Sequence, residues 1–189
     1  MTTRCSVKPG GISEVRRVEV LAAVKERRSI REFDPQHEVS PAQLETLLEA
    51  ARWAPSAGNA QPWRFVVVRT PGLRQGLVRA AWGQQFLAQA PVVIVVCADL
   101  ERARQAYGQR GEALYCLQDT AAAIQNLLLA ATQLGLGACW VGAFQEGEVS
   151  RLLGLAPGLR PVALIPVGYP AHSPPPRPRR PLSEIAEYR

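Results

Sequence analysis

Arg27-Arg28-Ser29-Ile30-Arg31 brings three arginines and a serine into five consecutive residues, at the end of a helix that the apolar pattern predicts over residues 18–28. Each guanidinium group is planar, permanently charged and able to donate two parallel hydrogen bonds to a phosphate. A helix continuing through the stretch would place Arg27 and Arg31 on one side. Taken alone, such a run is more typical of a solvated surface than of a phosphate site. The rest of the chain therefore has to decide between the two.

The length and composition suit one globular domain with a sizeable core, since the chain has 189 residues, 47% of them hydrophobic and 20% charged. Its net charge is +6, a balance that suits an anionic ligand, nucleic acid or an acidic membrane surface. No stretch approaches the roughly 18 apolar residues of a membrane span. Residues 1–17 lack the apolar core of a secretory signal. We expect them to be a disordered extension ahead of a single domain over residues 18–189.

Cysteine and histidine usage argues against several kinds of site. The four cysteines are Cys5, Cys97, Cys116 and Cys139, and no C-x-x-C pair is present. Cys97 and Cys139 lie in apolar runs, where a thiol behaves as a small hydrophobe. We therefore expect free thiols and a reducing compartment, the cytoplasm. The only imidazoles are His37, in a turn, and His172, in a proline-rich tail. Two isolated histidines do not provide the usual ligand spacing of zinc, so we expect neither a metal site nor a catalytic histidine.

Helix signals are strong in the middle of the chain. Ser40-Pro41-Ala42-Gln43 combines an N-cap serine, a proline at the first helical position and a capping-box glutamine. That helix should end near Trp53, because a proline two residues on disfavours helical backbone before it. A long helix, apolar on most of its sides, is predicted over residues 114–134, with Gly135 as its C-cap. Shorter helices are predicted over residues 73–80 and 146–153.

Apolar, valine-rich segments predict strands over residues 64–69, 91–98, 137–144 and 161–169. Pro166 would place the last of them at a sheet edge or a bulge. The polar segment 99–111, which contains Tyr107, is predicted to be a mobile surface segment or lid. Gly135 and Gly137 form a Gly-x-Gly pair, but they precede a strand instead of following one, so they do not match a dinucleotide-binding fingerprint.

Two proline-containing segments have more than one interpretation. Residues 55–63, Pro-Ser-Ala-Gly-Asn-Ala-Gln-Pro-Trp, either connect a helix to a strand or bring amide groups to a flat heterocycle that needs donors and acceptors. Residues 174–181 form a basic, proline-rich tail that favours an extended conformation with outward-facing arginines. Alone, that tail is most typical of a solvated segment, with an SH3-type ligand as the weaker alternative.

Five motifs occur in a fixed order: RRSIREFD, PSAGNAQPW, GLGACWVGAF, VGYP and PRPRRPL. Each alone is weak, but together they resemble the nitroreductase family of flavin enzymes, from residue 18 to the end. The resemblance implies an α+β fold, a mixed and largely antiparallel sheet flanked by helices, with a long central helix and a C-terminal segment that crosses to a partner. It also implies FMN bound in a symmetric homodimer, at sites formed by both subunits.

The resemblance assigns one group of residues to the phosphate end of FMN. Arg27 and Ser29 match contacts to the phosphate and ribityl groups, and Arg177 and Arg179 match tail residues that return to the phosphate. Arg28 lies inside a matching stretch at a position of less fixed role, and is a further cofactor-binding candidate. Several arginines can neutralise a phosphate dianion, so the chemistry agrees with this assignment.

A second group is implied at the flavin ring. Arg31 matches the cation beside flavin N1 and O2, and Gly142 and Ala143 match the turn whose N–H faces flavin N5. Arg31 and Gly142 are thus the catalytic candidates, and Gln85 matches a polar contact. Ala57 stands where the family often has a serine, so only its backbone is expected to contact the flavin. The loop that reaches the flavin from the other subunit is matched by Pro55, Ser56, Ala57 and Asn59.

The expected activity is that of an FMN-dependent oxidoreductase. It would take hydride from NADH or NADPH through flavin N5 and reduce a nitroaromatic, a quinone or a similar electron-poor acceptor by a ping-pong mechanism. Specialised flavin relatives are the alternative: a dehalogenase, a benzimidazole synthase-like enzyme or a dehydrogenase-oxidase. A basic nucleic-acid-binding module is the weaker alternative from another class, since the chain has no recognisable DNA-binding motif. We expect a homodimer with a small-molecule acceptor, and neither nucleic acid nor membrane as a partner.

Overall fold

The middle layer of the fold is an antiparallel sheet. A computed structural model describes residues 20–189, so the extension predicted over residues 1–17 lies outside the described part. The strands lie in the order β1 (Trp63–Val68), β2 (Val92–Asp99), β4 (Leu159–Gly168) and β3 (Gly137–Ala138), and each adjacent pair is antiparallel. Parallel pairing within residues 20–189 is limited to an isolated bridge between Ser29 and Ala138. The sheet is therefore more uniformly antiparallel than expected.

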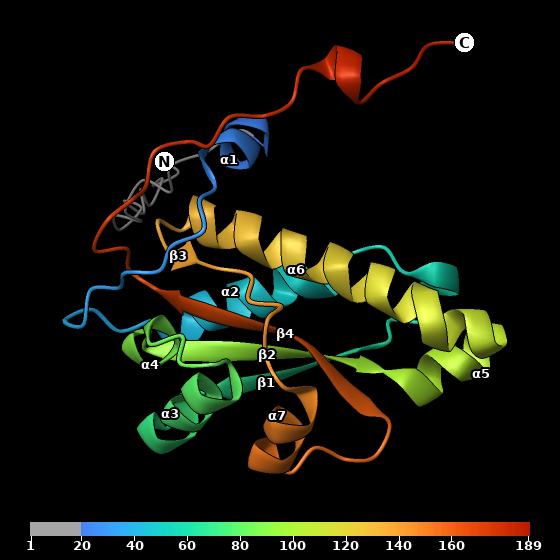
Figure 1. The fold of residues 1–189 in the computed structure, drawn as a ribbon, viewed down its shortest axis with the longest axis horizontal. Coiled ribbons are helices and arrows are strands. Elements are labelled where there is room, and N and C mark those ends of the chain that lie inside the picture. The colour runs from blue at the N-terminus through green and yellow to red at the C-terminus, as the bar shows by residue number, and fades with distance from the viewer. Residues whose placement is uncertain (1–19) are drawn as a thin grey trace, which may run out of the picture.

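Helices cover both faces of this sheet (Figure 1). On one face, α2 (Pro41–Arg52) and α6 (Cys116–Gln133) share a core with the strands. The other face carries α3 (Pro71–Ala80), α4 (Phe86–Gln89) and α7 (Glu146–Leu153). α1 (Val20–Glu26) lies beside α6, and α5 (Leu100–Arg110) follows β2. Among residues 20–189, no helix combines the length and the apolar character needed to cross a membrane.

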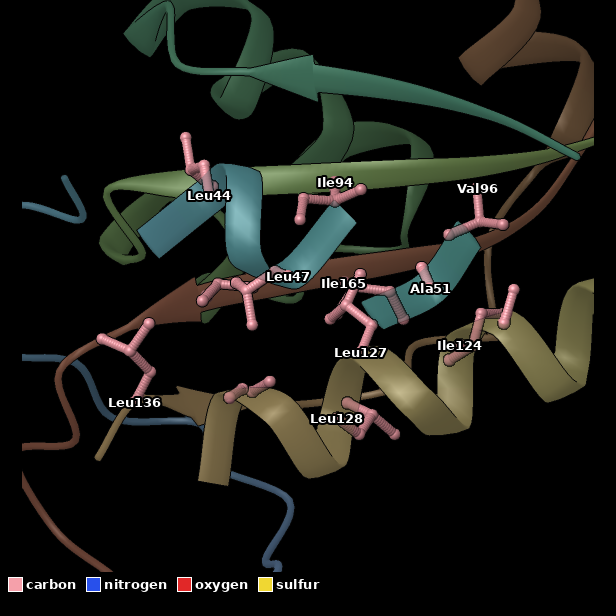
Figure 2. Packing of buried hydrophobic residues seen from close by; sticks show 14 of the residues in the cluster. Leu44, Leu47, Ala51, Ile94, Val96, Ile124, Leu127, Leu128, Leu136 and Ile165 are labelled. Atoms are coloured by element: carbon pink, nitrogen blue, oxygen red, sulfur yellow. The ribbon is translucent and has the colours of Figure 1, made fainter. Parts of the chain in front are cut away.

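The larger core lies between the sheet and the pair α2 and α6. Leu47 of α2 and Leu127 of α6 have no exposed surface, and they point toward Ile94 and Ile165 of the sheet (Figure 2). Burying one such side chain contributes about 1.5–3 kcal/mol, so this cluster holds α6 firmly on the sheet. α6 thereby sets the distance between the segments at its two ends, where the candidate site residues lie.

The local helix signals are confirmed. Ser40 N donates to Gln43 Oε1 at 2.9 Å and Ser40 Oγ accepts from Gln43 N at 3.2 Å, which is the predicted capping box. α2 ends at Arg52 with Trp53 as its C-cap. Gly135 follows α6 with a φ of 72°, the left-handed conformation that glycine adopts readily after a helix. α7 has the bounds that the sequence predicted, and the short α4 was not anticipated.

The segment predicted as a mobile surface segment or lid lies at the surface, as expected, and it is helical. The Asp99 carboxylate accepts a hydrogen bond from Arg102 N at 3.0 Å and so caps α5. The helix kinks at Tyr107 (φ −142°) and Gly108 (φ 57°) and continues through a π-helical turn, Gly111–Tyr115, into α6. Its polar composition reflects the exposure of almost its whole length to solvent.

β4 is an interior strand, so the sheet-edge position predicted from Pro166 was wrong. Leu164 N donates to Val141 O at 3.0 Å, and residues two apart in a strand direct their N–H groups the same way. Pro166 therefore lacks its N–H on the β3 side of β4, where regular pairing stops after two residues. The third predicted strand is accordingly reduced to β3 and the single bridge between Val141 and Leu164. The register shift of the β2–β4 ladder lies elsewhere, between Val96 and Cys97.

The apolar side of α1 faces outward. Val20, Leu21 and Val24, which the sequence placed on that side, expose 73%, 70% and 49% of their surface. Ala23 is the buried residue of the helix. Apolar side chains grouped on an exposed helix are typical of an interaction face. α1 therefore presents a face that residues 20–189 of one chain leave uncovered.

Candidate functional site

Side chains from two distant parts of the sequence line one cavity, which we call the arginine cavity. It has a volume of about 530 Å³ and lies between the end of α1, the segment 27–31 and the C-terminal tail. The tail passes beside α1 after the chain leaves β4 (Figure 1). The predicted cofactor residues Arg27, Arg28, Ser29, Arg31, Arg177 and Arg179 all line the cavity, together with Val24, Lys25 and residues 174–176.

The arginine cavity collects positive charge without a matching carboxylate. One lysine and five arginines line it, and no acidic residue does so within the described part of the chain. Elsewhere arginines pair with glutamates, as Arg52 does with Glu49. No salt bridge between residues 20 and 189 involves Arg27, Arg31 or Arg177. Clustered guanidinium groups repel one another and bind phosphate strongly, so the cavity is suited to an anion.

Backbone pairing fixes the segment 27–31 beside β3. Ile30 N donates to Ala138 O at 3.0 Å, and the buried Ile30 side chain packs against Gly137. A Cβ atom at Gly137 would stand 2.7 Å from Ile30 Cγ2, so glycine is needed for this close approach. Ala171 N donates to Glu32 O at 3.0 Å, which ties the start of the tail to the same region. These contacts bring the tail arginines next to the arginines of segment 27–31.

Arg31 reaches from the arginine cavity toward the start of α4. Its guanidinium carbon lies 5.9 Å from the centre of the Phe86 ring, and the exposed Gln85 immediately precedes that phenylalanine. Cys139 is buried close to the same segment. Burial raises the pKa of the Cys139 thiol, although the positive charge of Arg31 opposes the rise. Cys139 is therefore a neutral packing residue near pH 7 and not a candidate nucleophile.

The turn at residues 142–143 is pinned to the segment before α4. Gln84 Nε2 donates to Ala143 O at 3.0 Å, and Gln145 N donates to Ala80 O at 2.9 Å. Gly142 and Ala143 are exposed, and no atom outside its immediate neighbours lies within 4 Å of the Cβ position of Gly142. The turn thus offers a rigid, open stretch of backbone to a flat ligand, close in the fold to Gln85.

The loop at residues 55–59, called here the 55–59 loop, has an unusual backbone. Its residues Ala57–Asn59 form a 3₁₀ turn, η1, in which Gly58 has a φ of 53°. Asn59 also has a positive φ of 55°. Ser56 Oγ accepts a hydrogen bond from Gln61 N at 3.0 Å. Pro55 and Asn59 are exposed, whereas Ser56 is half-buried.

Side chains of α5 and α6 hold the 55–59 loop in place. Ala57 N donates to Asp119 Oδ1 of α6 at 3.1 Å. Tyr107 of α5 lies against Gly58, where a Cβ atom would stand 2.5 Å from Tyr107 Oη. The Ala57 N–H is thus used within the chain, and Ala57 O accepts from Ala60 N at 3.0 Å. The backbone contact expected between Ala57 and a flavin would therefore have to use the second lone pair of this carbonyl oxygen.

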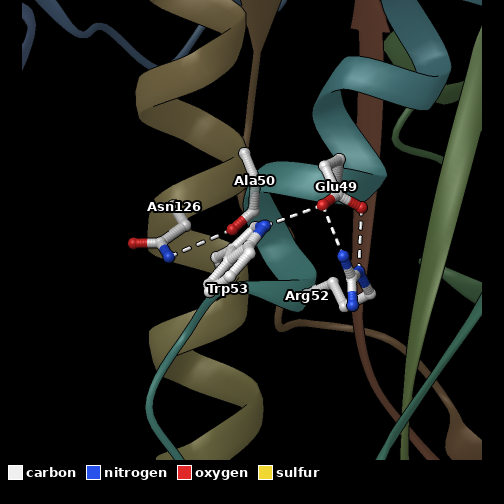
Figure 3. A network of polar contacts seen from close by, with 5 residues as sticks. All are labelled: Glu49, Ala50, Arg52, Trp53 and Asn126. Atoms are coloured by element: carbon white, nitrogen blue, oxygen red, sulfur yellow. Dashed lines mark hydrogen bonds and ion pairs between the residues drawn. The ribbon is translucent and has the colours of Figure 1, made fainter.

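A polar network fixes the end of α2, from which the loop departs (Figure 3). Asn126 Nδ2 of α6 donates to Ala50 O at 3.1 Å. Glu49 accepts from Arg52 Nε at 2.8 Å and from Trp53 Nε1 at 2.7 Å. The hydrogen bonds from Arg52 and Trp53 lower the pKa of Glu49 below its ordinary value, so its carboxylate is ionised near pH 7. α2 and α6 are thereby joined just before the 55–59 loop.

The arginine cavity and the 55–59 loop lie toward opposite ends of α6. Asp119, which contacts the loop, is in the first turn of α6. β3, which pairs with Ser29, follows the last turn. An α-helix rises 1.5 Å per residue, so the 18 residues of α6 span about 27 Å. A single chain therefore does not bring both groups of predicted site residues to one small ligand.

Known proteins are similar to this chain in sequence and in fold. A family model described as "Nitroreductase family" matches residues 24–85 and 74–169. The chain belongs to the nitroreductase family. It is 34% identical over 201 residues to the NADH dehydrogenase of Thermus thermophilus, covering 91% of this chain and 97% of the relative. It is 30% identical over 180 residues to the NAD(P)H-dependent enzyme named "FMN reductase" of Bacillus subtilis, covering 88% of this chain and 72% of the relative.

The nitroreductase fold is also found in solved structures. The crystal structure of the nitroreductase family protein from Streptococcus pneumoniae TIGR4 aligns with a TM-score of 0.81 and 30% sequence identity. The alignment covers 90% of this chain and 100% of that one. The α+β nitroreductase fold expected from the sequence motifs is therefore confirmed.

Four residues that the sequence interpretation did not single out support the nitroreductase site residues. Lys25 lines the arginine cavity, Phe86 lies beside Arg31, Gln84 holds Ala143, and Asp119 holds the 55–59 loop. Asp119 had a signal in the sequence, because it is the only residue of a charged type (Asp, Glu, Lys or Arg) in the mainly apolar segment 114–134. Gln84 had none, since the bond to Ala143 joins residues 59 positions apart.

Proposed function

We propose that this NAD(P)H-dependent oxidoreductase binds FMN between two copies of the chain and passes a hydride from NADH or NADPH to an electron-poor acceptor. A nitroaromatic compound or a quinone is the expected acceptor, reduced by a ping-pong mechanism. The observation that carries the proposal is the arginine cavity, where cations from both ends of the sequence gather without a carboxylate partner. Support also comes from the names of two relatives, an NADH dehydrogenase and an FMN reductase.

The arginine cavity has the chemistry that the phosphate of FMN requires. Arg27 and Ser29 of the segment 27–31 line the cavity together with Arg177 and Arg179 of the tail. Each hydrogen bond from a guanidinium group to a phosphate dianion is worth about 1.5–3 kcal/mol. Arg28 and Arg179 are proposed to contribute less, because each guanidinium group already donates to two backbone carbonyls, at 2.6 and 3.0 Å for Arg28 and at 3.1 and 3.3 Å for Arg179. The donor set therefore fits a terminal phosphate.

At the other end of the cofactor, Arg31 and the turn at residues 142–143 would meet the ring. When bound, FMN would supply a heterocycle that accepts a hydride from nicotinamide and releases it to the acceptor. Arg31 would place a positive charge beside the ring, and Gly142 would present its exposed backbone. A cation that meets charge developing in the reaction accelerates it, because it binds the transition state better than the ground state. These two residues are therefore proposed as the catalytic ones, with Gln85 and Ala143 as neighbours of the ring.

A second copy of the chain would complete the site. In one chain, the 55–59 loop is separated from the arginine cavity by roughly the length of α6. A symmetric pair would bring the loop of each copy, with Pro55, Ser56, Ala57 and Asn59, to the cavity of the other. The outward-facing apolar side of α1 offers a surface for this contact. We therefore propose a homodimer whose two flavin sites depend on its assembly.

The C-terminal segment offers the second copy a further contact. Leu182, Ile185 and Tyr188 expose 73%, 58% and 93% of their surface. β1 is an edge strand, and extended segments can add to such an edge. We propose that the end of one copy crosses to the other and lies beside β1. The receiving groove, between α2 and β1, has a volume of about 580 Å³ and its apolar lining includes Pro41, Leu44, Leu48, Trp63, Phe65 and Val67.

Absorbance spectroscopy and light scattering of the purified protein test the cofactor and the assembly together. The protein should be yellow, should release FMN and not FAD on denaturation, and should be a dimer with one flavin per chain. Colourless protein that cannot be reconstituted with FMN would contradict the proposal. If such protein also bound DNA in a salt-sensitive way, the nucleic-acid alternative would replace it. A flavin-loaded monomer would contradict the shared site.

Steady-state kinetics test the reaction. Initial rates measured across a panel of NADH, NADPH, nitroaromatics and quinones should give parallel double-reciprocal lines, as a ping-pong mechanism requires. Intersecting lines would contradict that mechanism. A protein that is reduced by neither nicotinamide donor, but that consumes a halogenated substrate or its own flavin, would instead belong with the specialised flavin relatives.

We also propose a cytoplasmic location, as the cysteine pattern led us to expect. Cys97, Cys116 and Cys139 are buried free thiols, and burial raises the pKa of Cys97 to about 11. Thiols of this kind persist in a reducing compartment. Cell fractionation with an antibody against the chain would test the location.

A further inference from the structure

Asp119 is an acidic side chain buried inside the protein. Only 7% of its surface is exposed, and within residues 20–189 the buried polar or charged side chains are Asp119 and Thr120. A buried carboxylate is costly unless other groups compensate for the lost water. Burial raises the pKa of Asp119, and the hydrogen bond from Ala57 N opposes that rise. Burying this side chain therefore costs free energy, and its contacts must show what it does in the protein.

Two common roles do not account for Asp119. No salt bridge in the described part of the chain involves it. It does not cap a helix either, because Tyr115 before α6 is itself helical (φ −65°, ψ −39°) and α6 continues from Gly111–Tyr115. Thr120, its buried neighbour, bonds only within its own helix, donating to Cys116 O at 2.8 Å. The hydrogen bond of Asp119 leads instead to another segment, at Ala57.

The N–H of Ala57 opens the η1 turn of the 55–59 loop. Ser56 stands at the N-cap position but makes no capping hydrogen bond, because its Oγ accepts from Gln61 N. Asp119 Oδ1 therefore supplies, from α6, the acceptor that the turn would otherwise lack. The loop needs such support, since Asn59 at its end and Gln61, two residues beyond it, have φ values of 55° and 53°. Left-handed backbone costs free energy in residues other than glycine and persists only where the surroundings enforce it.

We infer that Asp119 is a positioning residue for flavin binding, which holds the strained 55–59 loop in shape by accepting a hydrogen bond from the Ala57 N–H. It acts through the loop and does not itself contact the cofactor. The inference rests on the proposed function, because it takes this loop to meet FMN in the second copy. What the loop requires is an acceptor atom at this position, so a neutral acceptor of the same shape should serve nearly as well as the carboxylate.

Other contacts hold the remainder of the loop, so the effect of Asp119 should be local. Arg102 Nε donates to Ala60 O, and Tyr107 packs against Gly58. Replacing Asp119 with alanine should release the backbone at Ala57, while Tyr107 and Arg102 of α5 still contact Gly58 and Ala60. The fold should survive the change, because the buried carboxyl group, which is costly to bury, is removed together with its hydrogen bond.

The experiment compares wild type with Asp119→Ala, Asp119→Asn and the control Thr120→Val, each stripped of flavin. Hydrogen exchange of residues 57–61 is measured in the flavin-free proteins, and FMN affinity is measured by fluorescence titration. Asp119→Ala should speed exchange in the loop and raise the Kd for FMN about tenfold, the loss expected from one misplaced contact. Asp119→Asn should keep slow exchange and a Kd within about threefold of wild type. Thr120→Val should leave both loop exchange and FMN affinity unchanged.

Two results would overturn the role of Asp119. One is unchanged loop exchange in Asp119→Ala. The other is an Asp119→Asn variant that loses as much affinity as Asp119→Ala, because the charge and not the acceptor would then matter. A wild-type protein that binds no FMN would instead refute the proposed function. The exchange comparison on flavin-free protein would still decide whether Asp119 holds the loop, so the two failures can be told apart.

Discussion

Replacing Arg27 with alanine should weaken FMN binding by a predictable amount. Arg27 lines the arginine cavity, is half-buried, and has no carboxylate partner within residues 20–189. Its loss should remove at least one charge-assisted hydrogen bond to the phosphate, worth about 1.5–3 kcal/mol. That free energy corresponds to a roughly ten- to hundredfold higher Kd. The lower end is the more reasonable expectation, because the other cations of the cavity still attract the anion.

The assay is a titration of flavin-free protein with FMN, followed by quenching of flavin fluorescence. Arg79→Ala is the matched control, since Arg79 is an exposed arginine in the last turn of α3, outside the arginine cavity. Both variants lose one positive charge, so any effect of net charge alone is the same in each. Arg27→Ala should bind FMN at least about tenfold more weakly than Arg79→Ala. Equal affinities in the two variants would show that Arg27 makes no specific contact with the phosphate.

Three further predictions concern the ring, the core and the buried carboxylate. Arg31→Gln should leave most FMN bound but lower its two-electron midpoint potential by roughly 30–60 mV, as expected for about 1.5–3 kcal/mol of lost interaction. An unchanged midpoint potential in a redox titration would show that Arg31 only binds the cofactor and does not tune its potential. Gly137→Ala should lower the free energy of unfolding by about 1–3 kcal/mol, because its Cβ would stand 2.7 Å from Ile30 Cγ2. Gly147→Ala, which meets no atom within 4 Å, is the control in urea unfolding and should not destabilise. Burial raises the pKa of Asp119, so the contribution of this side chain to wild-type stability should fall as pH rises from the ordinary aspartate pKa through the raised one. Asp119→Asn cannot lose stability in this way, so in urea unfolding its stability relative to wild type should be greater at pH 7 than at pH 4, and a difference that does not grow with pH would contradict the raised pKa.

Some elements could be predicted because neighbouring residues alone specify them. The capping box of Ser40 and Gln43 and the glycine after α6 act within a few residues, so the start of α2 and the end of α6 were correctly placed. The segment 99–111 lies at the surface, as its polarity indicated, but its helical form was not predicted. Its polarity is compatible with either a loop or an exposed helix, and the choice is made by the Asp99 cap and by the continuation of the chain into α6.

The sequence by itself determined the local helices, the apolar strands and, through five motifs in order, membership of the nitroreductase family. It could not place β4 inside the sheet, because the partners of a strand depend on the path of the whole chain. Nor could it show that Arg27 and Arg177 share a cavity while the 55–59 loop lies toward the other end of α6. Those relations arise only when the core between α2, α6 and the sheet fixes the position of α6. Hydrophobic burial is non-directional, and it is the packed arrangement of these elements that decides which distant side chains meet.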